Sequence, residues 1–238
     1  WANSAHSVIV VTLLPIFFDS VAGYTADSVS SMSTWGYATS IAMAIVALAA
    51  PFLGVFGDIR GMRKRLFALF MGVGVVAVAL LSFTPLMDFT SSTAAAGRVA
   101  GLILALYIVS VIGFDASAIY YDAFLTDITT EDRMDRVSTM GYGLGYIGGS
   151  TIPLVIFLVM NLVGIPMLTC LAVIFAVTAV WWLGFSLPLL KNCRQTSGKP
   201  YEKGDVGRSI RGVGATIREI IANKPMLVYI LAYFFYID

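Results

Sequence analysis

Two aspartates stand inside long apolar stretches of the sequence, where a carboxyl group could exchange a proton or hold a polar solute. Asp115 lies in the fourth of these stretches and Asp238 in the last. A charged carboxylate at the centre of a bilayer costs about 2.5 to 3.5 kcal/mol, so residues of this kind usually have a function. Asp238 is therefore interpreted as a candidate proton or substrate site. For Asp115 the same interpretation stands beside an ion pair with Arg60 or Arg63, and we prefer the ion pair.

Three further side chains could share this chemistry. His6, the single histidine, lies in the first apolar stretch and could relay protons, although such a histidine more often bonds a neighbouring helix. Tyr142 and Tyr146 lie one helical turn apart and could line a cavity or simply pack. Cys170 and Cys193 are about a helix length apart, so no disulfide is expected. We predict no metal site and no cofactor, and no enzyme motif such as H-E-x-x-H is present.

The stretches that position these residues are apolar enough to lie in a lipid bilayer. The sequence has 238 residues, of which 58% are hydrophobic and 12% charged, and its mean hydropathy is +0.86. Soluble domains carry about 25% charged residues. Continuous apolar runs of this length satisfy their backbone hydrogen bonds in lipid as helices, so the predicted fold class is an all-α membrane protein. The predicted spans are 5–18 (or 22), 35–56, 66–86, 99–121, 137–162 and 166–189.

The basic residues are distributed unequally between the two sides of these spans. Four follow the second span, two follow the fourth and eight follow the sixth, so 14 of the 15 Lys and Arg share one side, and Arg98 is the exception. The positive-inside rule makes that side cytoplasmic, together with the N-terminus. We expect a multi-pass protein of the bacterial inner (cytoplasmic) membrane, surrounded by the lipid bilayer and with no nucleic-acid partner.

The sequence divides into three predicted parts. Residues 1–190 form a six-span half, and 191–224 form a cytoplasmic linker. Residues 225–238 open a seventh span. Within the linker, apolar residues from Ile210 to Ile221 recur at helical spacing with arginines on other faces, which predicts an amphipathic helix on the inner leaflet. Because the sequence begins without Met and ends within an apolar run, we expect it to be part of a longer chain whose C-terminal half is a partner.

The loop after the second span reads GDIRGMRKR at 57–65. Together with the preceding turn it resembles the signature of the major facilitator superfamily, G-x-x-x-D-(R/K)-x-G-(R/K)-(R/K). Ile59 and Met62 depart from it. In that superfamily the loop helps to hold the two halves of the protein together in one conformation. The resemblance therefore implies a gating latch, for which the candidate residues are Gly54, Asp58, Gly61, Arg63 and Lys64.

Three longer stretches resemble the vacuole-effluxer family, the group of autophagy-related amino-acid exporters and their bacterial relatives. They are WANSAHSVIVVTLLPIFF at 1–18, YYDAFLTDITTEDRMDRVSTMGYGLGYIGGS at 120–150 and LAYFFYID at 231–238. Asp122 and Thr126 stand where Asn and Pro are expected. The resemblance implies the N-terminal half of a secondary transporter that works by alternating access. It also implies export of amino acids or related metabolites, so the expected ligand is a small molecule. If transport is linked to protons, Asp238 is the first candidate to carry the proton and Asp115 the second.

A glycine-rich segment in the fifth span has two interpretations. Gly143, Gly145 and Gly148 spell G-x-G-x-x-G, but a nucleotide site requires a strand before this pattern. We interpret the segment as close helix packing by Gly141, Gly145, Gly148 and Gly149, with Gly141, Gly145 and Gly149 on one face.

Other functions remain open beside transport. A lipid flippase on the same fold and a polytopic receptor or sensor are the alternatives. A seven-span receptor would place its N-terminus outside, against the distribution of basic residues.

Overall fold

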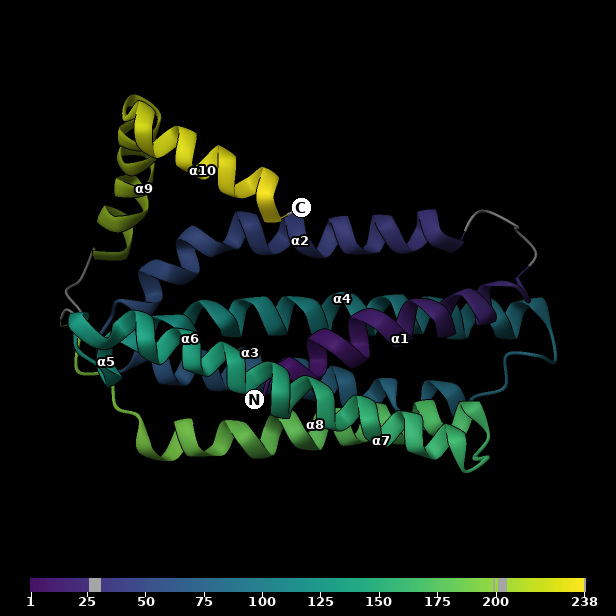
Figure 1. Cartoon of the computed structure of the whole chain (residues 1–238). Helices are drawn as coiled ribbons and strands as arrows, with labels where there is room; N and C mark the ends of the chain where they lie inside the picture. The colour runs from purple at the N-terminus through teal and green to yellow at the C-terminus, as the bar shows by residue number, and fades with distance from the viewer. Residues whose placement is uncertain (26–30, 199, 201–204, 238) are drawn as a thin grey trace.

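A computed structural model describes residues 1–25, 31–198, 200 and 205–237. Throughout that part of the chain the regular elements are helices, which confirms the predicted all-α fold class (Figure 1). In chain order they are α1 (Ser4–Ala22), α2 (Ser31–Gly57), α3 (Met62–Leu81), η1 (Thr84–Leu86), α4 (Thr93–Ala123), α5 (Leu125–Ile128), η2 (Glu131–Arg133), α6 (Met134–Leu144), η3 (Gly145–Ser150), α7 (Thr151–Leu162), α8 (Met167–Asn192), α9 (Asp205–Ala222) and α10 (Lys224–Ile237).

Six helical segments in the described residues are long and apolar enough to cross a membrane. They correspond to the six predicted spans, with α6, η3 and α7 together forming the fifth. The fourth begins at Thr93, ahead of the predicted Val99. The reason is a helix cap, because the Ser92 hydroxyl accepts a hydrogen bond from the Ala95 N–H at 3.1 Å.

The tightest packing lies where α3 crosses α4 and α8. A Cβ atom at Gly113 would lie 2.6 Å from the Gly74 nitrogen, and one at Gly74 would lie 2.5 Å from the Trp182 ring. These distances are shorter than any van der Waals contact, so only glycine allows the backbones of α3 and α4 to approach this closely. The contact fixes the rotation of α4 and thereby decides which of its faces is turned away from α3.

The fifth span packs against α1 through glycine, as predicted, but with a different set of residues. A Cβ atom would lie 2.9 Å from Ser4 at Gly145, and within 2.5 Å of Trp1 at Gly148 and at Gly149. Gly141 has nothing within 4 Å of such an atom among the described residues, so it takes no part in this contact, and its packing role stays a prediction. The segment Gly145–Ser150 is a π-helix, whose wider turn alters the spacing of residues on one face.

The connections that follow the second, fourth and sixth spans meet at one end of the bundle, and several basic residues, Arg63, Lys64 and Arg65 among them, lie in the adjoining helix turns. The connections from α2 to α3, from α4 to α6 and from α8 to α9 lie together there (Figure 1). The predicted linker helix is present as α9, which contacts α2 and α10 and runs across the direction of the six spans (Figure 1). Its placement on a membrane leaflet stays a prediction.

Candidate functional site

The turn between α2 and α3 brings the predicted latch residues to this end. Gly61 has a φ of 82°, a left-handed conformation that favours glycine, and α3 begins at the next residue. The turn buries the side chain of Arg63 and leaves that of Asp58 exposed. Arg63 is 5% exposed, whereas the Asp58 side chain is 82% exposed and lies 3.9 Å from the Arg63 guanidinium. Asp58 is thus only a weak partner of Arg63.

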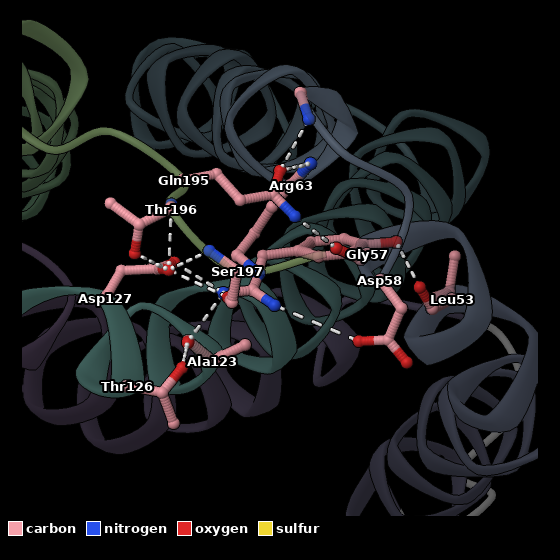
Figure 2. A network of polar contacts seen from close by, with 12 residues as sticks. Leu53, Gly57, Asp58, Arg63, Ala123, Thr126, Asp127, Gln195, Thr196 and Ser197 are labelled. Carbon is pink, nitrogen blue, oxygen red and sulfur yellow. Dashed lines mark hydrogen bonds and ion pairs between the residues drawn. The ribbon is translucent and has the colours of Figure 1, made fainter. Parts of the chain in front are cut away.

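The strong partner of Arg63 is Asp127, a residue of α5 that sequence reasoning did not select. Arg63 Nη1 donates to Asp127 Oδ2 at 2.5 Å and to the Ala123 carbonyl at 2.9 Å (Figure 2). The second bond places a cation on a carbonyl at the end of α4, where the helix dipole favours positive charge. The guanidinium also lies over the Phe124 ring, with Cζ 5.8 Å from its centroid. Arg63 therefore joins the start of α3 to the end of α4.

The other oxygen of Asp127 binds the segment that follows α8. Asp127 Oδ1 accepts hydrogen bonds from the backbone N–H groups of Thr196 and Ser197 at 3.0 and 2.9 Å. It also accepts from their hydroxyls at 2.9 and 2.8 Å (Figure 2). The Asp127 side chain has no exposed surface. A buried carboxylate is stable only when its charge is paired and its oxygens are hydrogen-bonded, and both conditions hold here.

Gln195 completes this arrangement by capping two helices with one side chain. Its Oε1 accepts from the N–H groups of Gly61 and Arg63 at 2.9 and 3.3 Å, and these groups lie at the start of α3. Its Nε2 donates to the Gly57 carbonyl at 3.1 Å, at the end of α2. Helix ends leave such groups unsatisfied unless another group binds them. We call Gly57, Gly61, Arg63, Asp127, Gln195, Thr196 and Ser197 the Arg63–Asp127 cluster (Figure 2).

The remaining predicted latch residues, Lys64 and Gly54, differ in the contacts that they make. Lys64 Nζ donates to the Cys193 carbonyl at 3.0 Å, which adds a further contact to the segment after α8. Gly57, which was not among the predicted latch residues, lies against Tyr120, whose ring would be 3.0 Å from a Cβ atom there. Gly54 has nothing within 4 Å of such an atom, so no close helix approach within the described part of the chain depends on it.

The preferred ion pair of Asp115 is not found. Arg63 binds Asp127 and Asp58, Arg60 is exposed, and Asp115 forms no ion pair within the described residues. Asp115 is two positions beyond Gly113, about 200° around α4, and therefore faces away from α3. Its Oδ2 atom is buried without a hydrogen-bond partner. The structure leaves the proton or substrate interpretation as the one to test.

His6 bonds a neighbouring helix, which is the more common of the two roles considered for it. It is 1% exposed, its Nε2 lies 3.3 Å from the Ser110 hydroxyl, and its ring stacks on Phe114 with centroids 4.6 Å apart. Tyr142 and Tyr146 are 66% and 70% exposed, so neither is buried by packing within the described residues. Asp238 lies outside the described residues.

Comparison with known proteins agrees with this architecture. A family profile described as "Vacuole effluxer Atg22 like" matches residues 19–238. The chain is 37% identical to a Bacillus subtilis (strain 168) protein described as the uncharacterized MFS-type transporter YxiO, over all of this chain and 55% of that protein. The chain thus spans about half the length of this curated relative. No solved structure matches. The profile match covers most of the sequence, and the chain belongs to the Atg22-like vacuole effluxer family.

Proposed function

We propose that this chain is the first half of a secondary transporter that exports amino acids or related small metabolites by alternating access. In this proposal residues 1–190 form the first half, 191–224 the linker and 225–238 the start of the second half. The end of the bundle that carries the Arg63–Asp127 cluster faces the cytoplasm. The family and the description of the relative as an MFS-type transporter support transport as the activity.

The observation that carries the proposal is the attachment of the linker to the cytoplasmic loops. Gln195, Thr196 and Ser197 bind the ends of α2, α3 and α5. The linker continues toward the second half, so rocking of that half pulls on the segment bound to the cluster. Asp58 projects from the same turn with 82% of its side chain exposed. Its carboxylate is free to bind the second half in one conformation and to release it in the other.

Asp115 is the proposed coupling residue. It lies within a span, on the face of α4 opposite the α3 contact, and no cation neutralises it within the described residues. A carboxylate in this setting carries its charge at a cost that a bound proton removes. Proton binding and release as the cavity alternates would couple transport to a pH gradient.

The test is uptake of labelled amino acids into proteoliposomes that contain the full-length protein, with and without an imposed pH gradient. Asp115→Asn should abolish gradient-driven accumulation and spare exchange at equal pH, since the amide cannot carry the proton. Asp122→Asn is the matched control, because Asp122 lies two turns further along the same face and is exposed. Full gradient-driven transport by Asp115→Asn would contradict the coupling role. Absence of flux for every amino acid tested would contradict the proposed substrate class.

A further inference from the structure

A long apolar groove runs between α3 and α4 on the face of α3 turned away from Gly74. Its volume is about 510 Å³, and every residue that lines it is apolar. Leu69, Val76 and Leu80 of α3 line it with exposed side chains, and Val109 of α4 forms part of the opposite wall. The groove is hollow in the middle because Gly72 has no side chain, and a Cβ atom there would have nothing within 4 Å.

The dimensions of the groove match one leaflet of a bilayer. Its lining on α3 extends from Ala68 to Leu80, which is about 18 Å along a helix that rises 1.5 Å per residue. The hydrocarbon core of a bilayer is about 30 Å thick, so one leaflet is about 15 Å deep. An extended acyl chain that enters from the end carrying the Arg63–Asp127 cluster would therefore lie along the whole groove.

A positively charged side chain, Arg65, lies at the end of the groove nearest the Arg63–Asp127 cluster. Arg65 is one turn before Leu69 on the same face of α3. It is exposed and forms no ion pair with any described residue, whereas Arg63 and Lys64 bind protein groups. An arginine at the membrane surface attracts an anionic headgroup, and its planar guanidinium binds phosphate oxygens in pairs.

We propose that the α3–α4 groove binds one anionic phospholipid, with an acyl chain along Leu69, Gly72 and Val76 and the headgroup phosphate on Arg65. The apolar lining selects an acyl chain, and the unpaired cation at one end selects a negatively charged headgroup. The site is separate from the Arg63–Asp127 cluster, and the proposal does not depend on the transport function.

The first test counts retained phosphatidylglycerol, against phosphatidylcholine, by native mass spectrometry of the full-length protein in detergent. Gly72→Phe fills the groove and should abolish binding of one phosphatidylglycerol. Arg65→Gln should weaken that binding about fivefold, the effect of one arginine near an anionic surface. The matched controls are Gly184→Phe, at an open glycine of α8, and Arg98→Gln, at an exposed arginine near the start of α4. Both controls should bind as the unchanged protein does.

A second measurement distinguishes a lipid from a second copy of the protein. A photo-reactive amino acid at Val76 should form a crosslink of phospholipid mass in liposomes. Crosslinked protein dimers in its place would overturn the proposal and identify a protein contact. Unchanged phosphatidylglycerol binding in both Gly72→Phe and Arg65→Gln, or equal binding of phosphatidylcholine, would also overturn it. If Gly72→Phe fails to fold, Arg65→Gln and the Val76 crosslink still decide the question.

Discussion

The carboxyl groups of Asp127 and Asp115 lie in opposite environments: the first has many polar partners and the second has a buried oxygen with none among the described residues. Asp127 has an ion pair with Arg63 and four hydrogen bonds from Thr196 and Ser197. Asp115 has no ion pair in the described part of the chain, and its Oδ2 is buried without a partner. A fully paired carboxylate holds a structure in place, because a change in its protonation would break several bonds at once. An unpaired one can change its protonation at little structural cost.

The two carboxyl groups also lie at different places, one just beyond the end of α4 and the other within that helix, which suits them to different roles. The cluster lies at the end of α4, where Arg63 binds the Ala123 carbonyl and draws α3, α5 and the linker together. Asp115 lies within α4, on the face that the contact between Gly74 and Gly113 turns away from α3. We infer that the first region fixes this end of the bundle and that the second is available for exchange with a ligand. Three substitutions at this end of the bundle follow, from the largest expected effect on stability to the smallest. Two are in the cluster and test the first role, and the third is at the neighbouring Asp58.

Asp127→Asn should have the largest effect. It removes the close counter-charge of the buried Arg63 cation and leaves, among the described residues, only the exposed Asp58 carboxylate at 3.9 Å. Removal of one partner of a buried pair typically costs about 3 to 5 kcal/mol, so the melting temperature in detergent should fall accordingly. Asp132→Asn is the matched control, because the Asp132–Arg133 pair is mostly exposed and such pairs contribute less than about 1 kcal/mol. A double-mutant cycle with Arg63→Gln measures the coupling between the two residues. Equal melting temperatures for Asp127→Asn and Asp132→Asn would show that the cluster is not a stabilising element.

Gln195→Ala should have an intermediate effect, because it removes three partly exposed hydrogen bonds at the ends of α2 and α3. The expected loss of stability is about 1 to 2 kcal/mol, the usual cost of leaving helix-end groups without partners. Arg194→Ala changes the exposed neighbouring residue and serves as the control. Proteolysis of the segment after α8 is the second measurement, and cleavage should become faster in Gln195→Ala. Identical cleavage rates in both variants would mean that Gln195 does not attach the linker.

The spans were predictable from the sequence because length and hydropathy suffice to identify a helix in lipid. That these connections share one end of the bundle was predictable for a similar reason, since it follows from counting the spans between them, and their placement on the cytoplasmic side stays a prediction. The close contact of Gly145 and Gly149 with α1 followed from the spacing of small residues, but the π-helix made Gly141 an exception that periodicity does not reveal.

The composition of the cluster was not predictable in the same way. Asp127 stands in the stretch that resembles the effluxer family, yet several acidic residues lie near it, and nothing local marks it as the one that becomes buried. Gln195 lies in a polar linker whose composition predicts flexibility. Both residues acquire their roles through contacts between segments that are far apart in the sequence, so only the fold identifies them. The ion pair preferred for Asp115 failed for the same reason, because Arg63 had a better-placed partner in Asp127.

Asp58→Asn should have the smallest effect on stability and still slow transport. Its side chain is 82% exposed and 3.9 Å from Arg63, so the lost attraction should change the free energy of unfolding by less than about 0.5 kcal/mol. If the exposed carboxylate binds the second half in one conformation, the amide should shift the balance between conformations and lower the transport rate severalfold, with substrate affinity unchanged. Fluorescence energy transfer between labels on the two halves measures that balance, and Asp135→Asn, an exposed aspartate at the same end, is the control. A collapse of substrate affinity with unchanged conformational exchange would instead make Asp58 a binding residue. Asp58 would then differ from both Asp127 and Asp115, as a carboxylate that is exposed at the end of the bundle and still contacts the ligand.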